Sequence, residues 1–135
     1  MNLEEYSRCD GVALAELVRK REVSPKELVQ LFVEAVEKIN PRINAIIEVY
    51  QDRVERLDDR VMFSGPFAGV PFLMKDIGSG EGGRLQESGS RLMKGYAVDK
   101  DSFLTTFFKK AGLILLGRTT TPEFALGVST ESVLL

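Results

Sequence analysis

The sequence predicts an α/β fold, and three observations support this class. Segments with helical periodicity alternate with short apolar segments that are typical of strands. A strand, a helix and a second apolar strand follow each other between residues 70 and 117, a pattern that normally leaves the two strands parallel in one sheet. The chain has 135 residues, 44% of them hydrophobic, which is enough for one domain with its own core. We expect a helical entry at about residues 10–40 and a sheet with its crossover helix at about residues 44–135.

The helical entry contains two predicted helices. The segment "GVALAELVRKR" is typical of a short amphipathic helix. In the second predicted helix, Ser24 is the expected N-cap, Pro25 takes the first helical position, and Glu27 completes a capping box. We expect this helix to end at Asn40, because the residue before a proline, here Pro41, is displaced from the helical conformation. Its apolar stripe consists of Leu28, Leu31, Phe32, Ala35, Val36 and Ile39.

The following segments predict a strand, a surface helix and a second strand. "NAIIEVY" is typical of a strand. "DRVERLDDRV" is typical of a surface helix, with Val54, Leu57 and Val61 on its apolar side. The second strand is expected around Val70 to Ile77.

A polar, glycine-rich passage then runs from Gly78 to Asp101, and a connection of this length is usually either functional or disordered. Asp101 is expected to cap a helix that Gly112 ends, and "LILLG" follows as a buried strand. "TTTPEFALG" predicts a capped turn or short helix, with Thr121 before Pro122. The apolar stripe of the capped helix should pack against the sheet, and it consists of Phe103, Leu104, Phe107 and Phe108.

Composition and charge exclude several classes of partner and site. A formal net charge of -2 and a pI near 5.3 give no basic surface for nucleic acid or an anionic membrane. No apolar run approaches the roughly 20 residues of a membrane span, and the amino-terminal segment is acidic where a signal peptide is basic, so we expect a cytoplasmic protein. One cysteine, Cys9, and no histidine exclude a disulfide framework and the usual zinc, haem and iron–sulfur ligand sets. We therefore expect no cofactor and no metal.

Lys75 is unusual because "GVPFLMKD" places it at the end of an apolar strand. In extended geometry it shares a face with Leu73 and Ile77, while Asp76 points to the other face. Its stem could lie along the strand with the ammonium group in water. Alternatively, burial would disfavour the charged form, so that the neutral amine could accept a proton from a serine. Asp76 either caps the following loop or orients a neighbouring group.

Four segments occur in an order that closely resembles the opening third of the amidase signature family. They are "SPKELVQLFVEAVEKINPRINAI", "GPFAGVPFLMKD", "ESGSRLMKGY" and "DSFLTTFFKKAGLILLGRTTTPEFA". Each segment alone is weakly specific, but together they cover most of the chain, from about Leu14 to Ser132. The resemblance implies an α/β/α sandwich around a mixed β-sheet, with these residues as the amino-terminal part of a single domain.

The same resemblance implies an amidase that hydrolyses an amide C–N bond with a Ser-cisSer-Lys triad. The lysine of the G-V-P-x-x-x-K-D motif corresponds to Lys75. Both triad serines would lie in a later Gly/Ser-rich segment that this sequence does not contain, so we expect the chain to be truncated and catalytically incomplete by itself. The expected partner is a small-molecule amide substrate, and a homo-oligomer remains open. The resemblance also permits the amide-transferring subunit of a glutamine-dependent amidotransferase.

The serines that are present are not expected to be the nucleophile. Ser88 and Ser90 fit the loop that lies beside the family's site, and Ser129 and Ser132 fit the lead-in to the absent segment.

The chain departs from the family pattern at four positions. Arg118 stands where lysine is usual and Thr120 where asparagine is frequent, and both should preserve a polar, capped turn. Gln86 and Glu87 replace smaller residues near the substrate entrance, where they either shape that entrance or belong to a solvated loop.

Two other functions are compatible with parts of the sequence. "GSGEGG" is glycine-rich and follows a strand, as in phosphate-binding modules, but Glu81 would repel an anion. A non-catalytic interaction fragment is the other alternative, with the aromatic stripe of residues 103–108 as its docking face.

Overall fold

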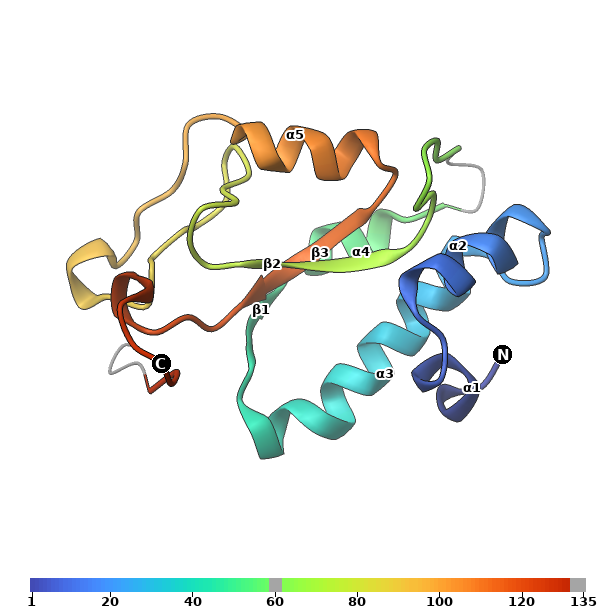
Figure 1. Cartoon of the computed structure of the whole chain (residues 1–135), viewed down its shortest axis with the longest axis horizontal. Coiled ribbons are helices and arrows are strands. Elements are labelled where there is room, and N and C mark those ends of the chain that lie inside the picture. Colours follow the sequence, from blue (N-terminus) through green and yellow to red (C-terminus); the bar gives the residue numbers. More distant parts are fainter. Residues whose placement is uncertain (59–61, 132–135) are drawn as a thin grey trace.

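A computed structural model describes residues 1–58 and 62–131 and places a mixed three-stranded sheet at the centre (Figure 1). The strand order is β1-β3-β2, formed by β1 (Ile46–Val49), β3 (Ile114–Thr119) and β2 (Pro71–Lys75). β2 and β3 are parallel, and β1 is antiparallel to β3. The α/β prediction is therefore confirmed, including the parallel pair on either side of a crossover helix.

Helices cover both faces of this sheet. The α-helices are α1 (Leu3–Ser7), α2 (Gly11–Arg19), α3 (Pro25–Ile43), α4 (Gln51–Arg56) and α5 (Phe103–Lys110), and η1 (Arg91–Met93) and η2 (Glu123–Ala125) are short 3-10 helices. The sequence did not predict α1, which a capping box between Asn2 and Glu5 begins. Val61, which was predicted to lie on the apolar side of the surface helix, is outside the described residues. Within the described ranges, no helix is long and apolar enough to cross a membrane.

α3 begins as predicted but ends later. The Ser24 hydroxyl accepts from the Glu27 backbone N–H, and the Glu27 carboxylate accepts from the Ser24 N–H. The predicted end at Asn40 is wrong, because the helix continues through Pro41 to Ile43. Pro41 is solvent-exposed in the last turn, where one lost backbone bond costs little, and the Asn40 side chain fastens the chain beyond the helix. Asn40 Oδ1 accepts from the N–H groups of Ala45 and Ile46.

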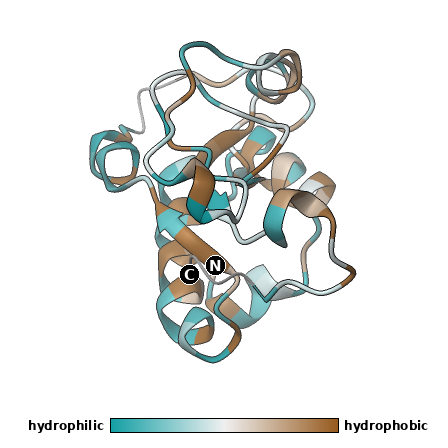
Figure 2. Ribbon diagram, turned by 90° about the vertical axis from the view of Figure 1, so that its left-hand side faces the viewer, coloured by the Kyte–Doolittle hydropathy of each residue, from teal (hydrophilic) through white to brown (hydrophobic). Residues whose placement is uncertain are grey.

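The core consists of apolar layers on the two faces of the sheet, whose strands are largely coloured as hydrophobic in Figure 2. On one face, Val29 and Phe32 of α3 pack with Ile114 and Leu116 of β3. On the other face, Phe108 of α5 packs with a cluster that contains Tyr50, Met74 and Leu115. The stripe predicted for α3 is buried at Leu28, Leu31 and Phe32, whereas Ile39 is 47% exposed.

Two predictions for the α5 region are wrong. Ser102, and not Asp101, caps α5, since its hydroxyl accepts from the Thr105 N–H; the Asp101 carboxylate binds the Gly82 N–H and Lys109 instead. The aromatic stripe does not pack wholly on the sheet, because Phe103 is 80% exposed and Phe107 is 51% exposed. Phe107 borders an apolar hollow of about 690 Å³ between α5 and the segment before β2. Phe103, Leu104 and Phe107 therefore form an open apolar face in this chain.

β3 contains an extra residue that changes which face its last side chains occupy. Phe72 of β2 pairs with Leu115, but Leu73 pairs with Gly117, so Leu116 has no partner in β2. Such a bulge interrupts the alternation of side chains along a strand. Leu116 packs toward α3, and Arg118 comes to pair with Met74 on the face that also carries Asp76.

Candidate functional site at the end of β2

Lys75 is the last residue of β2, and its side chain is exposed. Of the two alternatives for Lys75, this exposure fits the one in which the stem lies along the strand and the ammonium group is in water; the alternative burial is not seen in this chain. The backbone is nevertheless well held, since the Ser79 hydroxyl donates to the Lys75 carbonyl at 3.1 Å. Lys75 borders an open hollow of about 450 Å³ with mainly apolar neighbours, among them Ile77, Leu104 and Phe108. A charged side chain on a fixed strand end thus faces an apolar hollow.

Asp76, the next residue, is buried and fastens the loop of residues 86–90 to the end of β2. Its Oδ1 accepts from the Glu87 N–H at 2.9 Å, and its Oδ2 accepts from the Gly89 N–H at 3.2 Å. The Asp76 carbonyl accepts from the Ser88 N–H at 3.0 Å, and the Asp76 N–H donates to the Thr119 carbonyl at 3.2 Å. The interpretation of Asp76 as a loop-capping carboxylate is confirmed.

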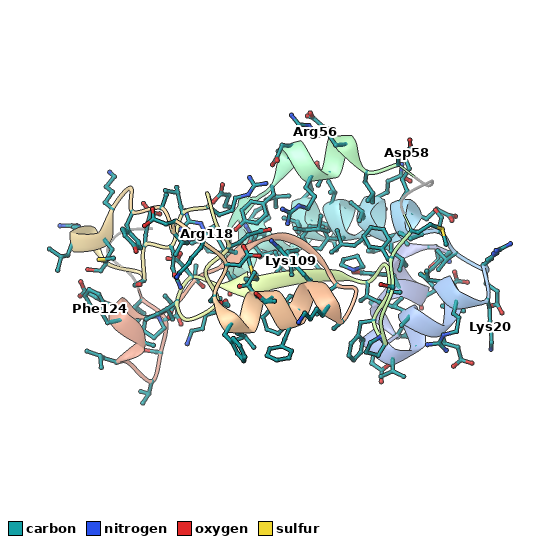
Figure 3. The ribbon with its side chains drawn as sticks, turned by 90° about the horizontal axis from the view of Figure 1, so that it is seen from above. Lys20, Arg56, Asp58, Lys109, Arg118 and Phe124 are labelled. Atoms are coloured by element: carbon teal, nitrogen blue, oxygen red, sulfur yellow. The ribbon has the colours of Figure 1, made fainter. Side chains whose placement is uncertain are left out.

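Arg118, labelled in Figure 3, is a buried residue of β3 and the centre of an ionic cluster with three carboxylates. Its Nε donates to Glu48 Oε2 at 2.7 Å, Nη1 to Asp76 Oδ1 at 2.7 Å, and Nη2 to Glu87 Oε2 at 2.9 Å. Burial by itself would lower the pKa of Arg118, but the hydrogen bonds to these carboxylates outweigh burial and raise it. The expectation that Arg118 belongs to a polar, capped turn is wrong, because it lies within β3.

Glu87 belongs to this cluster and is buried, so the alternative that it lies in a solvated loop is wrong. One carboxylate oxygen accepts from Arg118 and the other accepts from the Gly95 N–H at 2.8 Å. Burial raises the pKa of Glu87, yet these two partners outweigh burial and hold the pKa below its usual value. Gln86, beside it, is bound through its backbone N–H to the Tyr96 carbonyl. Hydrogen bonds therefore hold the first two residues of the loop of residues 86–90 in place.

The same loop contacts the segment that contains η2. The Ser90 hydroxyl is buried and donates to Glu123 Oε1 at 2.6 Å, and the Phe124 N–H donates to the Ser88 carbonyl at 2.9 Å. A Cβ on Gly89 would collide with the Thr121 carbonyl, so only glycine fits this approach. η2 itself forms without the predicted threonine cap. Ser129 donates to Glu131, and Ser132 lies outside the described residues.

A second ionic cluster holds the start of the glycine-rich passage. Glu81 is buried and binds Arg53 at 2.9 Å and Lys109 at 2.8 Å. Burial raises the pKa of Glu81, but the hydrogen bonds from Arg53 and Lys109 outweigh it, and the pKa falls below its usual value. A buried carboxylate in "GSGEGG" makes this loop unsuited to phosphate. Within residues 1–58 and 62–131, no group of His, Cys, Asp or Glu is arranged to hold a metal ion.

Sequence reasoning found Lys75 and Asp76 but missed the role of Arg118. A signal was present, because an arginine directly after "LILLG" would be buried in a central strand, and buried charges are normally paired. Its three partners come from positions 48, 76 and 87, and no local pattern connects these positions.

Comparisons with protein families and with known proteins both match this chain to amidase-type proteins. The family model described as Amidase matches residues 27–135. The chain is 40% identical over 124 residues to a 6-aminohexanoate-cyclic-dimer hydrolase of Paenarthrobacter ureafaciens, covering 90% of this chain and 25% of that protein. It is 37% identical over 119 residues to a subunit of the glutamyl-tRNA(Gln) amidotransferase of Methylacidiphilum infernorum, covering 88% of this chain and 24% of that protein. The chain thus spans about a quarter of the length of these curated relatives.

Solved structures agree with the sequence comparison. A structure of 6-aminohexanoate cyclic dimer hydrolase complexed with substrate superimposes with a TM-score of 0.84 at 39% identity. The superposition covers 93% of this chain and 26% of that chain.

Proposed function

The chain belongs to the amidase family, and from this premise we propose that it supplies the lysine of an amide-hydrolysing site in the complete protein that carries it. In this proposal Lys75 is the catalytic base, as the motif "GVPFLMKD" implies. One observation carries the assignment: Lys75 is an exposed lysine on a fixed strand end, beside a fully bonded aspartate and facing a hollow.

In this proposal Lys75 transfers protons during hydrolysis. Its neutral amine would take the proton of a serine hydroxyl as that oxygen attacks the amide carbon, and the resulting ammonium would return a proton to the departing nitrogen. A bridging serine would carry the proton between them. Both serines would come from a part of the complete protein that lies outside this chain.

For the substrate, we propose an uncharged aliphatic amide. The hydrolase relative acts on a cyclic dimer of 6-aminohexanoate, as its name states, and this chain shares 40% identity with it. The hollow beside Lys75 has mainly apolar neighbours and no described carboxylate or arginine in its lining, which fits an uncharged ligand. A second candidate, amide transfer within a glutamine-dependent amidotransferase, is supported by the relatives that are named as glutamyl-tRNA(Gln) amidotransferase subunits.

The decisive experiment compares both activities in the complete protein. We expect hydrolysis of the cyclic dimer or a similar amide without any acceptor, and no glutamine-dependent transfer. Lys75→Ala should lower turnover by about a thousandfold or more with an unchanged melting temperature, because members of a catalytic triad act as a unit. Lys100→Ala, at an exposed lysine in the glycine-rich passage, is the control and should leave turnover unchanged. A Lys75→Ala variant with near-normal turnover would refute the proposal.

A further inference from the structure

We propose that Arg118 is a positioning residue for Lys75, a role that rests on the proposed function of Lys75. By binding Glu48, Asp76 and Glu87 with one nitrogen each, Arg118 holds the end of β2 and the loop of residues 86–90 in one arrangement. The side chain of Arg118 itself does not contact substrate in this scheme.

The three bonds require a guanidinium group. Its nitrogens lie in one plane and point in different directions, so each can donate to a separate carboxylate. Here Nε, Nη1 and Nη2 reach oxygens on β1, at the end of β2 and in the loop, all between 2.7 and 2.9 Å. A lysine at position 118 would bring the same charge but a single nitrogen. Lysine is usual at this position in the family pattern, but this chain also has Glu87 where smaller residues are common, so a lysine here would leave at least one of the buried Asp76 and Glu87 carboxylates without its cation.

The bulge in β3 directs Arg118 toward these partners. With regular alternation, residues 114, 116 and 118 would share the face that packs on α3. The extra residue Leu116 instead places Arg118 opposite Met74 and next to Asp76. The carbonyl of Leu115, beside the bulge, accepts a hydrogen bond from Arg53 Nη1. A bulge that is stabilised in this way and aims a charged side chain at the residue after Lys75 fits a positioning role.

The cluster also connects Lys75 to the segment of residues 122–126. Arg118 binds Asp76, Asp76 binds the backbone of the loop at Glu87, Ser88 and Gly89, and the Ser88 carbonyl binds Phe124. Arg118 would therefore set the distance between Lys75 and whatever follows η2. In a triad, an error of about 1 Å in such a distance can lower the rate about 100-fold.

The test uses Arg118→Lys in the complete protein, with Arg84→Lys as the matched control. Arg84 forms a surface ion pair with Asp52 and has no described contact with Asp76 or with the loop of residues 86–90. We expect Arg118→Lys to lower kcat about 100-fold with KM changed less than about threefold, because the base is displaced while the substrate hollow remains. Hydrogen exchange at the Glu87 and Gly89 amides should accelerate in Arg118→Lys and stay at the wild-type rate in Arg84→Lys. Wild-type kcat in a folded Arg118→Lys variant would overturn the inference.

Chemical rescue separates positioning from general stability. Arg118→Gly should regain kcat when ethylguanidinium is added and should not regain it with ethylammonium. Only ethylguanidinium restores a planar group whose nitrogens can donate to separate carboxylates. Equal rescue by both cations, or rescue by neither in a folded protein, would contradict the inference. If neither Arg118 variant folds, Glu87→Gln replaces them, since it weakens one arm of the cluster and leaves two. Glu87→Gln should then lower kcat with KM retained, and an unchanged kcat would reject the inference.

Failure of the inference and failure of the proposed function give different results. An active Lys75→Ala variant would remove the proposed function and, with it, the role of Arg118. An inactive Lys75→Ala variant together with a fully active Arg118→Lys variant would leave the proposed function standing and reject only the positioning role.

Discussion

Arg118 and Asp76 join the two parallel strands through a side-chain ion pair of 2.7 Å that is almost wholly removed from water. Asp76 also accepts two backbone N–H bonds from the loop of residues 86–90, so this pair stabilises both the sheet and the loop. Removing Asp76 would take one of three carboxylates from the buried Arg118 and would leave the Glu87 and Gly89 N–H groups without their acceptor.

Asp76→Ala is therefore predicted to destabilise the fold strongly. The expected loss in the free energy of unfolding is about 3–5 kcal/mol, the range for breaking a buried pair. Denaturant titration of wild type and variant measures it. Asp52→Ala, which removes a surface pair with Arg84, is the control and should change stability little. Similar losses in the free energy of unfolding in both variants would show that the buried Arg118–Asp76 pair stabilises the fold no more than a surface pair does.

Lys75→Arg should abolish activity almost as completely as Lys75→Ala. A guanidinium group stays protonated at any workable pH and cannot accept the proton of a serine. The pH–rate profile of the wild-type complete protein is the reference for this comparison. An active Lys75→Arg variant with the same profile would show that position 75 supplies positive charge and not proton transfer.

Stability is predicted to fall in acid because of Glu81 and Glu87. The pKa of each carboxyl group lies below its ordinary value of 4.5 in the folded chain, as their cationic and N–H partners outweigh burial. The folded state thus binds these protons less tightly than the unfolded state. Their contribution is complete above the unfolded value and is lost as the pH falls from about 4.5 through the folded pKa values.

Melting temperatures between pH 6 and pH 3 test this. Glu81→Gln should be less stable than wild type near neutral pH, and its stability should fall less steeply in acid. The double change of Glu81 and Glu87 to Gln should flatten the curve further. Parallel curves for wild type and the double variant would count against these two groups as the source of the acid sensitivity.

Gly117→Ala should be much more damaging than Gly78→Ala. A Cβ at position 117 would collide with the Glu48 carbonyl in the neighbouring strand, so β1 or β3 would have to move. Gly78 has φ +81° with no atom within 4 Å of the added carbon, and its substitution should cost only about 1 kcal/mol for the left-handed conformation. Thermal unfolding of the two variants, with circular dichroism, compares them. Equal melting temperatures would mean that the bulge in β3 tolerates a side chain.

The exposed aromatic face of α5 is predicted to make this chain self-associate when it is expressed alone. Phe103 and Phe107 are largely exposed, whereas Phe108 packs against Phe72 with ring centroids 4.7 Å apart. The double variant Phe103→Ser with Phe107→Ser should reduce association in light scattering, because it removes exposed apolar area. Phe108→Ser should instead lower stability. A monomeric wild-type chain with a sharp cooperative melt would refute the prediction.

Much of the secondary structure and the family could be predicted from the sequence because the signals are local. The capping box of Ser24 and Glu27, the strand around residues 70–77 and the motif that contains Lys75 depend on neighbouring residues along the chain. The end of α3 was mispredicted because the stabilising contacts of Asn40 come from its own side chain and the residues after the helix. Pro41 alone therefore did not decide where the helix ends.

The sequence by itself determined the alternation of helices and strands, the parallel pair β2 and β3, and the position of Lys75 at a strand end, since periodicity and capping act over a few residues. Only the tertiary structure decided that Arg118 pairs with Glu48, Asp76 and Glu87, because the unpaired residue Leu116 turns it to the face where those carboxylates meet. Only the tertiary structure likewise decided that Lys75 is exposed and Asp76 is buried, because burial depends on which distant segments pack over the end of a strand.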